Sequence, residues 1–311
     1  ALICKGDPAV NRIVKYIPQM PDSEFKGETL YIRVKEDGGY RIFSPFYVPT
    51  LDDYDLYECH VGLGYSRVVS KFYGIRTEAN MFVPAGSKRE LRDIKVTNLR
   101  KEAVDLDIIP VVEYTHFEAL KQFNNNDWVP QTMQSWCVAQ DGGRKVLFQA
   151  AFMKKGREMN YLTSNQPVAS FETDRRVFLG ENGYGTWARP ESLKQEEFSD
   201  YEALRGDNVG VLMHHMEEIA PGGMVRLITQ LAQCADLADD MAEIESYRDP
   251  ANVDKAFRDL AAFWDTYLKQ MQVNTPDESF NTMINVHNPR QCYMTKNWSR
   301  YLSLYQLGLG T

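Results

Sequence analysis

Residues 93–97 read Asp-Ile-Lys-Val-Thr, and residues 104–108 read Val-Asp-Leu-Asp-Ile. In both stretches apolar side chains alternate with polar ones, and this period of two predicts strands with one buried face. Similar alternation recurs from Glu28 to about Leu231. Most of the chain is therefore predicted to be short β-strands.

Three glycine-rich turns separate the predicted strands. They are residues 37–39 (Asp-Gly-Gly), 141–143 (Asp-Gly-Gly) and 221–223 (Pro-Gly-Gly). Glycine supplies the positive φ that tight hairpin connections need. Because the pattern offers few crossover helices, a parallel sheet is disfavoured. The predicted fold is mainly β, a large antiparallel β-sandwich.

The period changes after about residue 236. From Asn252 to Val273 apolar side chains fall three and four residues apart, which predicts one amphipathic helix. Asp249 and Pro250 supply a polar cap and a residue favoured in a first helical turn, so the helix is predicted to begin there.

A second helix is predicted to begin at Thr275. Thr275 can cap it, and Glu278 can reach back to complete a capping box. Its inner face continues to His287, and Pro289 is expected to stop or kink the helix because proline lacks a backbone donor.

Charge and composition exclude several classes of protein. The 311 residues carry a formal net charge of −8, which argues against a nucleic-acid partner. No apolar run approaches the roughly 20 residues of a membrane helix, so no membrane association is expected. The chain starts at Ala1 without an initiator Met or a signal-peptide layout, as expected of a chain trimmed at both ends.

The 5 cysteines are widely spaced and odd in number. This pattern predicts neither a disulfide framework nor a zinc site. We therefore expect buried thiols in a reducing compartment, and cytoplasmic localisation.

Three longer blocks carry a family resemblance. Residues 57–66 contain Glu-x-x-x-Gly-Leu-Gly-Tyr, residues 171–180 contain Phe-x-Thr-Asp-Arg followed by Phe-x-Gly, and residues 291–300 run from Gln-Cys to Asn-x-Ser-Arg. In order and spacing they resemble the inverting β-glucoside phosphorylases of glycoside hydrolase family 94. That family includes cellobiose, cellodextrin, chitobiose and laminaribiose phosphorylases.

The resemblance implies a domain organisation. The family has a β-sandwich, a helical linker, an (α/α)₆ catalytic barrel and a small closing β domain. For this chain it implies a sandwich over residues 1–235, a linker over residues 236–287 and the truncated start of the barrel over residues 288–311. The family's general acid would lie beyond Thr311, so no catalytic residue is expected in this chain, and the chain alone is expected to be inactive.

The implied activity is that of a glycosyltransferase-type phosphorylase. Such an enzyme cleaves a β-linked glucose di- or oligosaccharide with inorganic phosphate and gives α-glucose 1-phosphate. A single carboxylic acid suffices, because phosphate is already an anionic nucleophile. The resemblance implies phosphate as co-substrate, no cofactor, no metal, a β-glucan oligosaccharide substrate and a homodimer.

The resemblance also points to site residues. Arg300, in the Asn-x-Ser-Arg motif, corresponds to a phosphate ligand, and its guanidinium fork suits bidentate phosphate binding. Thr311 and Trp128 stand where cellobiose phosphorylases carry a donor-site Arg and an acceptor-site Arg. These departures argue against cellobiose itself as the substrate. Trp128 can stack on a sugar face or belong to the sandwich core.

Two histidine-containing pairs are interpreted as structural. His214 and His215 are predicted on one strand, where neighbours point to opposite faces and cannot share a metal. Cys59 and His60 lack partner ligands, which favours a structural thiol over zinc.

Three polar segments complete the candidates. Arg175 and Arg176 beside Asp174 are interpreted as a salt-bridged sheet edge. The loop at residues 124–127 resembles a family segment near a neighbouring subunit's active site and is a candidate for the acceptor pocket. The acidic run at residues 236–240 is interpreted as a solvated approach to a helix.

Two other functions stay open from the sequence. One is a carbohydrate-binding or scaffolding sandwich without catalysis. The other is a glucan-synthesising enzyme that carries a related phosphorolytic module.

Overall fold

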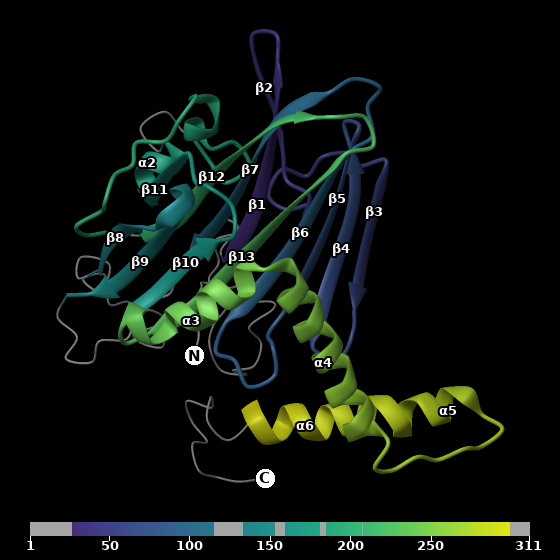
Figure 1. The fold of residues 1–311 in the computed structure, drawn as a ribbon. Helices are drawn as coiled ribbons and strands as arrows, with labels where there is room; N and C mark the ends of the chain where they lie inside the picture. The colour runs from purple at the N-terminus through teal and green to yellow at the C-terminus, as the bar shows by residue number, and fades with distance from the viewer. Residues whose placement is uncertain (1–26, 115–132, 153–158, 181–184, 207, 299–311) are drawn as a thin grey trace.

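The computed structural model describes residues 27–114, 133–152, 159–180, 185–206 and 208–298. Within these ranges the strands form a smaller and a larger antiparallel sheet (Figure 1). The smaller sheet contains β1 (Glu28–Glu36), β2 (Gly39–Phe43), β7 (Val104–Glu113), β11 (Ser170–Asp174) and β12 (Asn208–Ile219). The larger sheet contains β3 (Leu56–Val61), β4 (Tyr65–Phe72), β5 (Ile75–Phe82), β6 (Glu90–Asn98), β8 (Met133–Ala139), β9 (Lys145–Ala151), β10 (Met159–Ser164) and β13 (Met224–Cys234).

The two sheets have the orders β11-β12-β7-β1-β2 and β3-β4-β5-β6-β13-β10-β9-β8 over the described residues. Their facing surfaces bury the apolar half of each alternating strand. Ile32 and Ile108 from the smaller sheet join one core with Ile94 and Leu227 from the larger sheet. The predicted mainly β, antiparallel sandwich is confirmed.

Two of the predicted glycine turns, at residues 37–39 and 141–143, connect antiparallel neighbours within a sheet, whereas the third carries the chain from the smaller sheet to the larger one. Glu36 pairs with Gly39 between β1 and β2, which leaves Asp37 and Gly38 as the turn, and Gly38 has φ +92°. Residues 220–223 join β12 to β13, and Gly222 there has φ +73°.

The smaller sheet is covered on its outer face as well. The short helix α2 (Arg175–Leu179) and residues 185–206 pack there, and Phe178 and Leu193 join a second core with Tyr31. The hydroxyl of Tyr31 donates to the carbonyl oxygen of Trp187 at 2.5 Å. Burial on both faces explains why β7 is apolar over most of its length.

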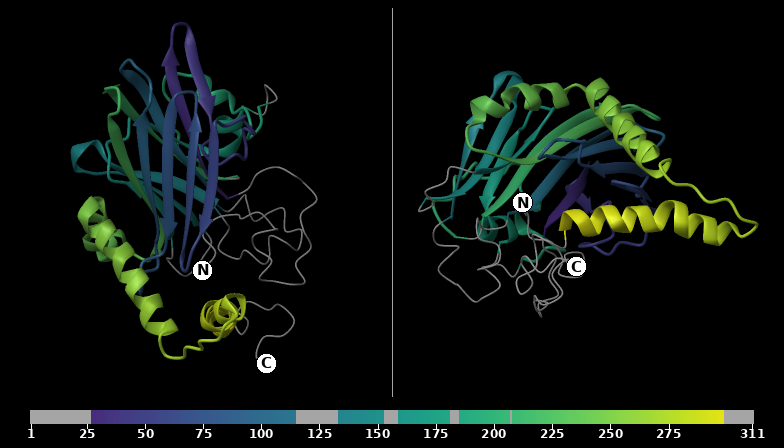
Figure 2. Two further views of the ribbon diagram at one scale, coloured as in Figure 1. Left: turned by 90° about the vertical axis from the view of Figure 1, so that its right-hand side faces the viewer. Right: turned by 90° about the horizontal axis from the view of Figure 1, so that it is seen from below.

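Helices α3 (Leu237–Arg248) and α4 (Pro250–Leu268) lie along the outer side of the larger sheet (Figure 2). The α4 start is confirmed, since the Asp249 carboxylate accepts from the Ala251 backbone N–H at 2.9 Å. The predicted end at Val273 is wrong. Asn285 hydrogen-bonds both the N–H and the C=O of Val273, at 2.8 and 2.7 Å, in place of helical partners.

The second linker helix also differs from its prediction. It consists of α5 (Glu278–Thr282), the π-turn η5 (Met283–His287) and α6 (Asn288–Trp298). Its cap is Asp277, whose carboxylate accepts from the backbone N–H groups of Ser279 and Phe280, while Thr275 lies outside the helix.

Pro289 does not stop the helix. The backbone N–H of Asn288 bonds to the carbonyl of Met283, five residues back, so the turn before the proline is widened. A π-turn gives the proline ring room where an ordinary α-turn would clash with it. Tyr293 on α6 then packs against Trp264 of α4, with ring centroids 5.1 Å apart.

The prediction of buried thiols is wrong for two cysteines. Cys59, on the edge strand β3, and Cys292, on α6, are exposed. Cys234 is buried and Cys137 half-buried, and burial raises the pKa of each thiol to about 11. Cys4 lies outside the described residues.

Candidate functional site

The sequence-predicted site residues lie outside the part of the chain that the structure describes. This holds for Arg300, Trp128, Thr311 and the loop at residues 124–127. Their roles stay predictions, and the site that can be built from described residues is a different one.

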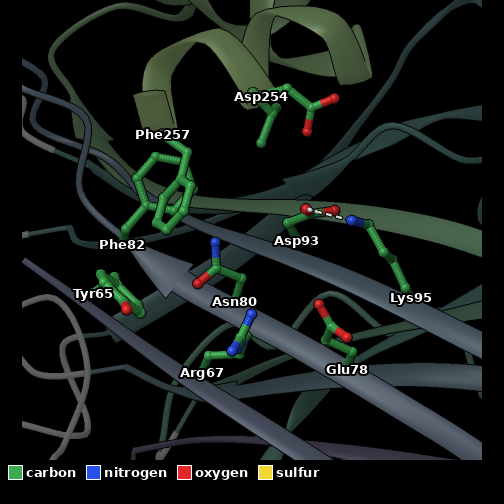
Figure 3. A pocket seen from close by; sticks show the side chains of 10 residues that line it. Tyr65, Arg67, Glu78, Asn80, Phe82, Asp93, Lys95, Asp254 and Phe257 are labelled. Carbon is green, nitrogen blue, oxygen red and sulfur yellow. Dashed lines mark ion pairs between the residues drawn. The ribbon is translucent and has the colours of Figure 1, made fainter. Parts of the chain in front are cut away.

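A cleft of about 230 Å³ opens between the outer face of the larger sheet and α4 (Figure 3). Strands β4, β5 and β6 form its floor and α4 forms its opposite wall. The lining residues are Tyr65, Arg67, Glu78, Asn80, Phe82, Asp93, Lys95, Val253, Asp254 and Phe257.

The floor consists of polar cross-strand rows. Asn80 pairs with Arg67 on one side and with Asp93 on the other, so these three side chains face the cleft side by side. In the next row Glu78 is the partner of Lys95. Alternate residues of a strand share a face, which is why polar residues of separate segments meet here.

One wall of the cleft is aromatic. The ring of Phe257 on α4 lies 5.1 Å from the ring of Tyr65 and 5.2 Å from that of Phe82, centroid to centroid. Leu260 and Trp264, one and two turns further along α4, are buried in the same cluster. This apolar seam fixes the helix against the sheet.

An ion-pair network closes the other end. Arg226 on β13 donates to both oxygens of Asp93, at 2.6 and 3.0 Å, and to both oxygens of Asp254, at 2.7 and 3.3 Å. The hydrogen bond from Arg226 lowers the pKa of the Asp254 carboxyl. The network ties the sheet to the first turns of α4.

The Gly-Leu-Gly-Tyr segment that carries part of the family resemblance has a structural role here. Gly64 has φ +79°, and a Cβ atom on it would lie 2.8 Å from Nε1 of Trp264 and 3.1 Å from Leu260. A Cβ atom on Gly62 would lie 2.0 Å from the ring of Tyr65. The segment therefore permits close docking of α4.

The histidine pair behaves as predicted. His214 is buried, and its Nδ1 donates to the Pro167 carbonyl at 2.7 Å, while His215 lies on the other face beside Asp107. Asp107 also pairs with the buried Arg33. Among the described residues no group of three His, Cys, Asp or Glu side chains could hold a metal ion.

The interpretation of Arg175 and Arg176 as a salt-bridged sheet edge is confirmed for the salt bridges only, because both residues lie on α2, directly after the edge strand β11. Arg175 lies 3.4 Å from a Glu113 carboxylate oxygen, and Arg176 lies 3.9 Å from Asp174, which caps α2.

The interpretation of residues 236–240 as solvated is wrong for one member. Asp240 pairs at 3.1 Å with the buried Arg89 and accepts from the Tyr161 hydroxyl, because α3 lies on the sheet.

A two-sheet sandwich of this size with a docked linker helix defines a supersandwich module. Residues 1–250 match the glycosyl hydrolase 94 supersandwich domain, and residues 263–311 match the catalytic domain of the glycosyl hydrolase 94 superfamily. The chain belongs to glycosyl hydrolase family 94.

Similar proteins include several with stated activities. An N,N'-diacetylchitobiose phosphorylase of Vibrio proteolyticus is 26% identical over 97% of this chain, and a solabiose phosphorylase of Paenibacillus borealis is 24% identical over 85%. The cyclic beta-(1,2)-glucan synthase NdvB of Rhizobium meliloti is 25% identical over 85% of the chain. The chain spans 37%, 34% and 9% of these relatives, respectively.

Within the described ranges, none of the helices combines the length and the apolar composition that a bilayer crossing requires.

Proposed function

We propose that this chain is the amino-terminal part of an inverting phosphorylase. The complete enzyme cleaves a β-linked glucose di- or oligosaccharide with inorganic phosphate and releases α-glucose 1-phosphate. One observation carries the proposal: a supersandwich match and a catalytic-domain match follow one another in a single chain. The phosphorylase activities stated for similar proteins support the same reaction class.

The residue roles are those that the family resemblance implies. Arg300 binds phosphate through its guanidinium fork, and Trp128 and Thr311 contact the saccharide. The general acid belongs to a part of the protein outside this chain, and no second carboxylate is needed because phosphate itself is the nucleophile. The family resemblance implies no metal and no cofactor. We further propose a cytoplasmic homodimer.

The sandwich and the linker then have a supporting role. We assign the sandwich to residues 1–235, the linker to residues 236–287 and the start of the catalytic barrel to residues 288–311. The docking of α4 through Gly64 and Arg226 supports the assignment of this helix to the linker, since it fixes the helix to the sheet of the sandwich.

The test is phosphorolysis by the complete protein and by this chain. The complete protein should release α-glucose 1-phosphate from a β-linked disaccharide only when phosphate is present, and this chain alone should not. In the complete protein, Arg300→Lys should lower kcat/KM for phosphate by roughly a hundredfold, whereas Arg290→Lys on α6 serves as the control. Turnover without phosphate, or turnover by the chain alone, would refute the proposal.

A non-catalytic binding sandwich is the alternative. The catalytic-domain match over residues 263–311 disfavours it. Saccharide binding by the complete protein without any phosphorolysis would restore it.

A further inference from the structure

We propose that the cleft between β4–β6 and α4 binds one neutral pyranose unit of a saccharide. The site is built from Arg67, Asn80, Tyr65 and Phe257 and is independent of the phosphate-binding role proposed for Arg300.

The polar floor offers a matched donor and acceptor. Nε of Arg67 and Oδ1 of Asn80 are buried atoms without a hydrogen-bond partner in the protein, and the two residues are direct cross-strand neighbours. Buried polar atoms are almost always satisfied, because leaving one unpaired is unfavourable. A sugar hydroxyl both donates and accepts, so adjacent hydroxyls can satisfy the Asn80 oxygen and the Arg67 nitrogen together.

The aromatic wall supplies the apolar contact that a pyranose needs. Figure 3 shows Tyr65, Phe82 and Phe257 together on one side of the polar row, with Glu78 and Lys95 on the other. A ligand between them meets aromatic carbon on one side and hydrogen-bonding groups on the other. Pockets that combine apolar lining with a few placed polar groups are typical of small-molecule sites.

The charges of the cleft favour a neutral ligand. Arg67 and Lys95 face the acidic side chains of Glu78, Asp93 and Asp254. Arg226, which pairs with Asp93 and Asp254, balances the remaining negative charge. An anion such as phosphate would be attracted by the two cationic side chains in the cleft but repelled by the three carboxylates.

The volume limits the ligand to a single ring. Drug-sized ligands occupy pockets of roughly 300 to 1,000 Å³. This cleft, at about 230 Å³, suits one sugar residue rather than a chain of them.

The experiment is a titration of the protein with methyl β-D-glucopyranoside and with its N-acetylglucosamine counterpart, followed by saturation-transfer NMR. Inorganic phosphate is the anionic comparison. We expect saturation of the protons on one face of the sugar ring, because that face lies on the aromatic wall, and no competition by phosphate.

Substitutions of the two polar floor residues test whether the sugar binds in this cleft. Arg67→Met and Asn80→Leu should each weaken binding about tenfold, as loss of one hydrogen bond to a charged or buried group predicts. Lys71→Met is the control, because Lys71 lies on the same face of β4 as Arg67 and is not part of the cleft lining. Thermal unfolding of each variant establishes that it is folded.

Trp128→Ala separates this proposal from the proposed function, which gives Trp128 a contact with the saccharide. Sugar binding that persists in Trp128→Ala and falls in Arg67→Met supports the cleft. Binding that is unchanged in folded Arg67→Met and Asn80→Leu overturns it, as does binding of phosphate alone or of neither sugar.

Discussion

Arg226 and Asp254 join the larger sheet to the linker helix α4. The guanidinium of Arg226, on β13, donates to both carboxylate oxygens of Asp254, on α4, at 2.7 and 3.3 Å. The same guanidinium holds the buried Asp93. The linker helix is therefore held by a charge network as well as by its apolar seam.

The first prediction concerns this network. Arg226→Met should lower the free energy of unfolding by about 3 kcal/mol, because the carboxylate of Asp93, only 7% exposed, loses its hydrogen-bonding partner and keeps only Lys95, at 3.9 Å. Asp254→Asn should lower it by less than about 1 kcal/mol, since Asp254 is 47% exposed and solvent screens its pair. Urea denaturation of both variants measures the difference, and equal losses would contradict this account.

The second prediction concerns the docking glycine. Gly64→Ala should destabilise the protein by roughly 2–4 kcal/mol, because it combines left-handed backbone strain with a clash against Trp264. Gly38→Ala is the control: its φ is also positive, +92°, but nothing lies within 4 Å of the added Cβ. Its loss should be only about 1 kcal/mol. Similar melting temperatures for the two variants would show that Gly64 is not needed for docking.

The third prediction is a pH dependence. Burial lowers the pKa of His214 to about 4, from an ordinary value of 6.5. The unfolded chain therefore binds the proton first, so the contribution of His214 to stability is complete above pH 6.5 and decreases as the pH falls toward 4. The loss is roughly 3 kcal/mol.

His214→Asn tests this dependence, because an asparagine amide can still donate to the Pro167 carbonyl. Between pH 6.5 and 4 the unfolding of the natural protein should take up about one more proton than the unfolding of the variant. The free energy of unfolding of the variant should therefore fall less steeply as the pH is lowered. Parallel pH profiles would rule out a buried neutral His214.

The fourth prediction concerns the second family block. The Asp174 carboxylate accepts from the backbone N–H groups of Arg176 and Val177 at the start of α2. Asp174→Ala should cost about 1–2 kcal/mol of stability, and Asp174→Asn, which keeps an acceptor oxygen, should cost less. If chemical denaturation gives the same loss of stability for both variants, capping of α2 does not explain the contribution of Asp174.

Local patterns predicted much of the fold. The alternation around Ile94 and Ile108 predicted strands, and the glycine turn at Gly38 predicted a hairpin. Both predictions succeeded because the face of a strand and a positive φ depend on residues that are neighbours in the chain. Asp249 predicted the start of α4, because a helix cap also depends only on neighbouring residues. The end of α4 could not be predicted, since Asn285 takes over the backbone groups of Val273 from a later helix.

The three motif blocks also identified the family from the sequence, but not what the blocks do in the fold. The close contact of Gly64 with Trp264 needs both segments in place. The pairing of Asp240 with Arg89 was missed because an acidic run near a helix start looks the same whether or not a buried arginine lies opposite.

The sequence by itself thus determined the sandwich, its turns, the start of the linker and the family. Only the tertiary structure decided where the cleft lies, because Arg67, Asn80, Asp93 and Asp254 come from three strands and a helix. Strand register and helix docking bring these side chains together, and both are set by contacts between residues far apart in the chain, which no local pattern encodes.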